Sequence, residues 1–212
     1  MNRNRIAIVA ALAVSLFSSV ASATTLNLVQ PNTSRGSFVT FNFNGSDETG
    51  FAGPLSFSIN GSSTLYDFFC VDLTTMAIQN SPYEAMTLPV TVINNGERVA
   101  WMFLNLGPAA QNVLTGTALQ LAIWDVVHDG GNGLSAGVFQ ATASISSAII
   151  AQAESYISAS VGQQATGAAI YESVLGPNDR QLQIGQVPEP GTFVLLVSGL
   201  VLAGFGARRK RA

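Results

Sequence analysis

Two hydrophobic ends enclose a middle section of different composition, and this division limits what can fold as a domain. Residues 6–17 and 191–207 are apolar runs, and six of the nine basic residues lie near the chain ends. Residues 24–186 hold three arginines and eleven acidic residues, a formal charge of −8. We expect one domain in this section. Because it is acidic and has no lysine, it cannot neutralise phosphates, which argues against a nucleic-acid partner.

The first 23 residues have the three parts of a secretory signal peptide. Arg3 and Arg5 precede the first apolar run, and Ala21-Ser22-Ala23 follows it as a small-residue cleavage site. The mature chain should therefore begin at Thr24. The alternative, a retained membrane anchor, suits the short apolar run less well.

The C-terminal section, residues 187–212, is also divided into three parts. Val187-Pro188-Glu189-Pro190 precedes the second apolar run, and residues 208–212 form a basic tail. Residues 192–207 as a helix would extend about 24 Å, somewhat short of a hydrocarbon core of about 30 Å, and snorkelling arginines could cover the difference. Positive charge after the span predicts a cytoplasmic C-terminus and an exported domain.

This order of Pro-Glu-Pro, apolar span and basic tail resembles the PEP-CTERM sorting tail of Gram-negative bacteria. The resemblance implies sorting by an exosortase, a membrane cysteine peptidase. It also implies delivery to the cell surface or the extracellular polymer matrix, with the C-terminal helix in the membrane before that. A simple membrane anchor is the alternative interpretation.

The middle section predicts an α+β fold, with β-sandwich or barrel-like sheets and a helical middle part. Alternating or β-branched runs predict strands. Helical spacing and stop signals predict three helices. We expect Asn44 to begin a loop that extends to Gly53, and Asn60-Gly61 to form a hairpin turn. The expected strands are 24–29, 37–43, 55–60, 63–73, 86–94, 168–175 and 181–184, and the expected helices are 97–106, 117–128 and 141–160.

Two short stretches of the middle section carry the candidate chemistry. FFCVDL contains Cys70, the single cysteine of the chain, and TALQLAIWDVVHD contains Gln120. We predict a strand for the first stretch and an amphipathic helix, capped by Thr115 or Thr117, for the second. One cysteine excludes an internal disulfide. Free cysteine is usually a small buried hydrophobe, and the alternative is a reactive thiol.

Together these stretches resemble the thioester domains of bacterial surface adhesins. That family pairs an aromatic-Cys-apolar-acidic strand motif with a helix motif in which Gln precedes Trp. The resemblance implies an internal thioester between Cys70 and Gln120, which an amine or hydroxyl group of a surface or matrix partner then attacks. It places Asp72 and Trp124 as supporting residues. We expect covalent attachment rather than catalytic turnover.

Each further residue near these motifs has an ordinary interpretation as well. On a strand, Asp72 would share a face with Cys70 at about 6.5 Å, where it positions a group or satisfies a turn. Trp124 lies one helical turn from Gln120 and is expected to pack beside it. His128, about 12 Å along the helix, is too far for direct contact. No metal site, cofactor or Ser-His-Asp set can be assembled. A non-covalent matrix or adhesion protein is the alternative function.

Overall fold

The computed structural model describes residues 23–187, which form nine strands, three α-helices and two short 3-10 helices. The strands are β1 (Thr24–Pro31), β2 (Ser37–Phe43), β3 (Ser46–Ala52), β4 (Leu55–Ile59), β5 (Leu65–Cys70), β6 (Tyr83–Pro89), β7 (Phe139–Ala141), β8 (Ala168–Ser173) and β9 (Gln183–Gln186). The helices are α1 (Gly96–Leu106), α2 (Val113–Asp129) and α3 (Ser147–Ala159), with 3-10 turns η1 (Val90–Val92) and η2 (Gly107–Ala109).

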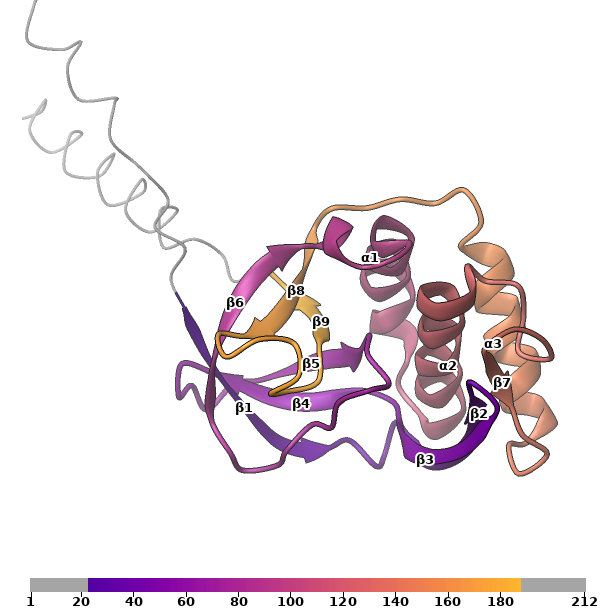
Figure 1. Cartoon of the computed structure of the whole chain (residues 1–212), viewed down its shortest axis with the longest axis horizontal. Helices are drawn as coiled ribbons and strands as arrows, with labels where there is room; N and C mark the ends of the chain where they lie inside the picture. The colour runs from indigo at the N-terminus through magenta and orange to yellow at the C-terminus, as the bar shows by residue number, and fades with distance from the viewer. Residues whose placement is uncertain (1–22, 188–212) are drawn as a thin grey trace, which may run out of the picture.

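Six strands close into an antiparallel barrel in the order β1-β4-β5-β9-β8-β6. The strands β3, β2 and β7 form a separate antiparallel sheet. Figure 1 shows the barrel on one side of the molecule and the helices on the other, with α2 between the barrel and α3. The expected α+β class, with barrel-like sheets and a helical middle part, is confirmed.

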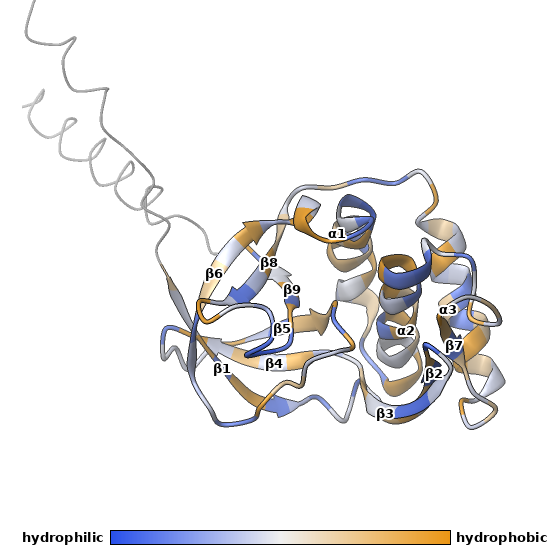
Figure 2. Cartoon of the chain, viewed as in Figure 1, coloured by the Kyte–Doolittle hydropathy of each residue, from blue (hydrophilic) through white to orange (hydrophobic). Residues whose placement is uncertain are grey.

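Helix α2 is the centre of the molecule, and the expectation that it is amphipathic was wrong. Every residue from Gly116 to Val127 is buried, because α1, α3, the small sheet and β5 surround the helix. Polar Thr117, Gln120 and Asp125 are fully buried among apolar neighbours. Figure 2 shows this mixture as blue and orange stretches along the same helix. Buried polar groups normally need partners inside the protein.

The first turn of α2 begins earlier than expected. Its N-cap is Asn112, whose side chain accepts from the Thr115 backbone at 3.0 Å, while Thr115 Oγ1 accepts from the Asn112 backbone at 3.3 Å. This reciprocal capping box satisfies free backbone donors at the helix start. Gly116 is required next, because a Cβ atom there would lie 1.8 Å from the Arg35 carbonyl oxygen.

The loop expected between Asn44 and Gly53 is a strand instead. β3 pairs with the whole length of β2 through a two-residue turn at Asn44-Gly45, both with positive φ. Its first four residues are exposed because β3 is the solvated edge of the sheet. Their polar side chains therefore resemble the sequence of a loop. The expected turn at Asn60-Gly61 is confirmed by two left-handed residues.

Some other boundaries differ from those expected. β6 begins at Tyr83 and ends at Pro89, where η1 takes over from the predicted strand. Residues 139–141 form β7, so α3 begins only at Ser147, with Ser146 as its N-cap. β5 ends at Cys70 and does not extend to residue 73.

The predicted signal peptide and the predicted C-terminal membrane helix lie outside the described residues. Between residues 23 and 187, no helix combines the length and the apolar character needed to cross a membrane.

Candidate functional site

Gln120 lies against Cys70, and both polar atoms of its carboxamide bond to the Cys70 backbone. The Cys70 N–H donates to Gln120 Oε1 at 3.0 Å, and Gln120 Nε2 donates to the Cys70 carbonyl oxygen at 2.8 Å. Gln120 is fully buried. Its carboxamide carbon therefore lies directly beside the backbone of the residue that carries the thiol.

The pairing of neighbouring strands explains this arrangement. β4 accompanies β5 only as far as Leu55 opposite Phe68, while β9 follows the other edge of β5 to Gln183 opposite Cys70. β4 therefore has no residue opposite Cys70 that could bond to its backbone. The Gln120 carboxamide occupies this position and bonds to the strand edge as a further peptide group would.

The thiol of Cys70 points to different partners. Its Sγ–H donates to Gln181 Oε1 at 2.8 Å, and Gln183 Nε2 donates to the sulfur at 3.5 Å. Gln181 is held in turn, because its Nε2 donates to the Asp72 carbonyl oxygen at 2.8 Å. Neither glutamine was a candidate from the sequence. The one available signal was the Gln-x-Gln spacing, which places both side chains on one face where β9 begins.

Burial is the main cause of a raised pKa at this thiol. The pKa of Cys70 rises from 9.0 to about 12, opposed by the hydrogen bond from Gln183 and increased further by the negative charge of Asp72. The sulfur is therefore protonated at neutral pH. A thiolate is the competent nucleophile, so the thiol must lose its proton during any attack.

Asp72 lies in the loop after β5, so the expectation that it shares a strand face with Cys70 was wrong. One carboxylate oxygen accepts from the backbone and the hydroxyl of Thr74, both at 2.7 Å. Its other oxygen, Oδ2, is buried and has no hydrogen-bond partner among residues 23–187. The side chain closes a turn with one oxygen and keeps an unused acceptor with the other.

Trp124 packs between the helix and the small sheet. Its ring lies 5.3 Å from Phe41 and 5.7 Å from Phe139, centroid to centroid. Its Nε1–H is buried without an acceptor in the described part of the chain. Trp124, Cys70 and Gln181 all line a cavity of about 330 Å³ between the barrel and the small sheet. We refer to it as the thiol cavity.

His128 has no hydrogen bond to Cys70 or Gln120. Its ring packs edge-on against Phe43, with centroids 5.0 Å apart, and its Nε2 has no partner within the described residues. Burial lowers the pKa of His128, and the charges of Asp72 and Asp129 oppose that shift. The imidazole is therefore neutral at neutral pH. Residues 23–187 contain no group of three His, Cys, Asp or Glu side chains placed to hold a metal ion.

Comparison with known proteins bears on the end of the chain and not on the barrel. No curated protein and no solved structure matches. Residues 186–211 match the PEP-CTERM protein-sorting motif, a region that begins at the last residue of β9 and contains Val187, Pro188, Glu189 and Pro190. Residues 188–190 lie outside the described part of the chain. By this match, the chain carries a PEP-CTERM sorting motif, which indicates an exported, surface-associated protein with an exosortase as its sorting partner.

Proposed function

We propose that this exported protein attaches covalently to a surface or matrix partner through a thioester between Cys70 and Gln120. The observation that carries the proposal is the contact between the two residues. Two hydrogen bonds hold the Gln120 carboxamide against Cys70, although fifty residues separate them in sequence. The carboxamide is thereby fixed beside the residue that carries the thiol, and proximity of the reacting groups lowers the barrier to an intramolecular acyl transfer.

The first step converts the side-chain amide into a thioester. The Cys70 sulfur bonds to the Gln120 carboxamide carbon, the C–N bond breaks, and the thiol proton leaves with the nitrogen as ammonia. Sγ must release Gln181 to reach that carbon. The carbonyl oxygen already accepts the Cys70 N–H, and a backbone donor in that position stabilises a developing oxyanion.

The second step transfers the acyl group to the partner. An amine or hydroxyl oxygen bonds to the Gln120 carbon, the C–S bond breaks, and the proton of the nucleophile passes to the sulfur. The thiol cavity offers the route, because it is lined by Cys70 and opens between the barrel and the small sheet. The product is one stable amide or ester per molecule, so the protein is not a turnover enzyme.

One set of observations favours the non-covalent alternative. Both polar atoms of Gln120 are engaged by backbone groups, and the thiol is protonated and bonded to Gln181. These contacts explain a buried Gln and a buried Cys without any reaction. In that case the domain is an adhesion or matrix protein whose Cys70 and Gln120 hold α2 to the barrel.

Intact mass of the exported protein separates the two functions. With the thioester, the wild-type mass is one ammonia below the sequence mass, and incubation with methylamine adds the whole amine at Gln120, which leaves the product one CH2 group above the sequence mass. Cys70→Ala should have the unmodified mass and incorporate no amine. A wild-type protein at full sequence mass, whose denatured thiol alkylates completely, would refute the thioester.

A further inference from the structure

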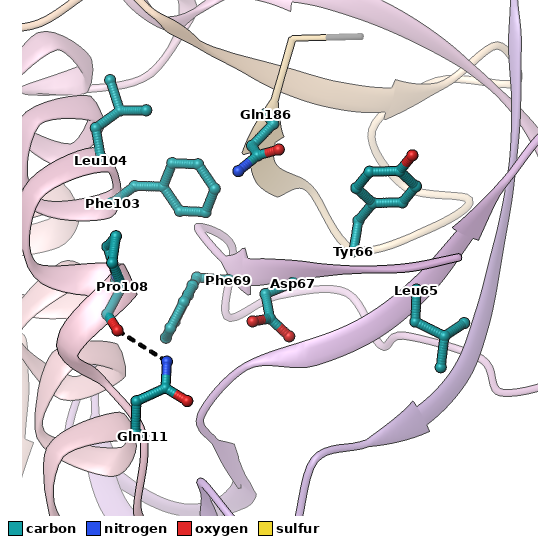
Figure 3. Close-up of a pocket in the computed structure, with 10 residues that line it drawn as sticks. Leu65, Tyr66, Asp67, Phe69, Phe103, Leu104, Pro108, Gln111 and Gln186 are labelled. Carbon is teal, nitrogen blue, oxygen red and sulfur yellow. Dashed lines mark hydrogen bonds between the residues drawn. The ribbon is translucent and has the colours of Figure 1, made fainter.

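A second hollow lies at the seam between the barrel and the helices, away from the thiol. Its volume is about 330 Å³, and it is bordered by β5, the end of β9, the C-terminal half of α1 and the connection to α2. Figure 3 shows the strands on one side of it and α1 on the other. We refer to it as the seam cleft. Its size is at the lower end of the range for small-molecule sites, about 300–1,000 Å³.

Aromatic rings form one part of the seam cleft and hydrogen-bonding groups form another. The rings of Phe69 and Phe103 meet edge to face, with centroids 6.3 Å apart. Figure 3 shows the Gln186 and Gln111 carboxamides and the Asp67 carboxylate around these rings. Phe69 and Phe103 are almost completely buried, so the accessible apolar surface comes from the half-buried Tyr66 and Leu104.

Much of the hydrogen-bonding capacity of the cleft is unused. Gln111 Nε2 donates to the Pro108 carbonyl oxygen at 2.8 Å, which leaves its side-chain oxygen without a donor among the described residues. The Gln186 carboxamide has no hydrogen bond within residues 23–187, and Asp67 uses one oxygen in an ion pair with Arg35. A carboxamide offers both donors and acceptors, so the free groups suit a ligand that has both.

The charges of the cleft exclude strongly ionic ligands. No Lys or Arg lines it, so it has no group to recognise a phosphate or carboxylate. Its single carboxylate, Asp67, is already paired with Arg35. The remaining chemistry is an uncharged molecule with hydroxyl groups at its edge and an apolar C–H face for the rings.

We propose that the seam cleft binds a neutral saccharide. A pyranose ring presents a C–H face to the half-buried Tyr66, while its hydroxyl groups bond to Gln111, Gln186 and Asp67. The proposal does not depend on the thioester. The residues that line the seam cleft and those that line the thiol cavity do not overlap.

Isothermal titration of the full-length chain tests this inference. The protein is kept in a phosphocholine detergent, because detergents with sugar headgroups would compete. The probes are neutral hexasaccharides of β-1,4-glucose, β-1,3-glucose, α-1,4-glucose and β-1,4-mannose, with a galacturonic acid hexasaccharide as the charged comparison. We expect at least one neutral probe to bind and the charged one to bind at least tenfold more weakly.

Matched variants locate the binding. Gln186→Ala and Gln111→Ala should each weaken it about tenfold, whereas Gln164→Ala, an exposed glutamine outside the cleft, should not change it. Cys70→Ala should bind the saccharide as the wild type does, which separates this site from the thioester. Absence of binding by every neutral probe, equal binding of the charged one, or no effect of both cleft variants would overturn the inference.

Discussion

The two hollows beside β5 have similar volumes but opposite use of their polar groups. In the thiol cavity, the Cys70 thiol and the residue that holds it, Gln181, are bonded to other parts of the protein. In the seam cleft, Gln186 and half of Gln111 are free within the described chain. The first hollow is therefore part of what holds the fold together, and any reaction there must displace structural bonds. The second can accept a ligand without displacing any.

The largest expected loss of unfolding free energy follows from substitution of Gln120. Compared with the wild type that retains the Gln120 carboxamide, Gln120→Ala would leave the N–H and C=O groups of Cys70 buried without partners and open a cavity, which should cost about 3–5 kcal/mol of unfolding free energy. Gln120→Leu refills the volume but not the hydrogen bonds, so it should recover about 1–2 kcal/mol of that loss. Urea unfolding measures both. A loss below about 1 kcal/mol for Gln120→Ala would mean that the carboxamide is not structural.

The next largest effect is the pH dependence of stability that the Cys70 thiol causes. Burial raises the pKa of Cys70 from 9.0 to about 12, so above pH 9 the folded state keeps a proton that the unfolded state has lost. In protein whose Cys70 is a free thiol, stability should therefore fall as pH rises, by up to about 1.4 kcal/mol per pH unit between 9 and 12, relative to Cys70→Ala; in protein that carries the thioester, this difference should be absent. Unfolding both proteins across this range tests it.

Measuring stability relative to Cys70→Ala removes the pH dependence that comes from titrating groups that do not interact with Cys70. Burial also raises the pKa values of Tyr83 and Tyr171. Tyr171 titrates in the variant as in the wild type, whereas the pKa of Tyr83 is raised further by the charge of Cys70, so part of the difference between the two profiles comes from Tyr83. Identical pH profiles of the two proteins would contradict a free thiol. That result is expected only when Cys70 is already held in a thioester.

The smallest effect is expected in the seam cleft. Gln186→Ala and Gln111→Ala remove exposed side chains that no buried group depends on, so unfolding free energy should change by no more than about 0.5 kcal/mol. The same unfolding measurement serves as the check. A loss above about 1 kcal/mol in either variant would show that the cleft, like the thiol cavity, is a structural region.

The sequence predicted correctly those elements that are determined by residues close together in the chain. β2 has the bounds that its alternating residues indicate, and the Asn60-Gly61 turn follows from two residues that tolerate positive φ. Helix α1 likewise begins within one residue of the expected position. In each case, the decisive contacts lie within a few residues of one another in the chain.

The remaining features depend on partners distant in sequence. β3 is polar because one face of it meets solvent, and α2 is buried on all sides only because four other parts of the fold cover it. Gln181 reaches the thiol across 111 residues, and nothing near Cys70 indicates it. The seam cleft is assembled from β5, α1, η2 and β9, so no single stretch of sequence could reveal it.

β9 is the element through which a mechanical load on the C-terminal tail would enter the domain. The sorting motif begins at Gln186, so a protein held by its C-terminal tail would be pulled through this four-residue strand. β9 is paired with β5 on one edge and β8 on the other, and it closes the barrel between them. It supplies Gln183 to the thiol and Gln186 to the seam cleft. A load on the tail would therefore act on both hollows before it reached the helices.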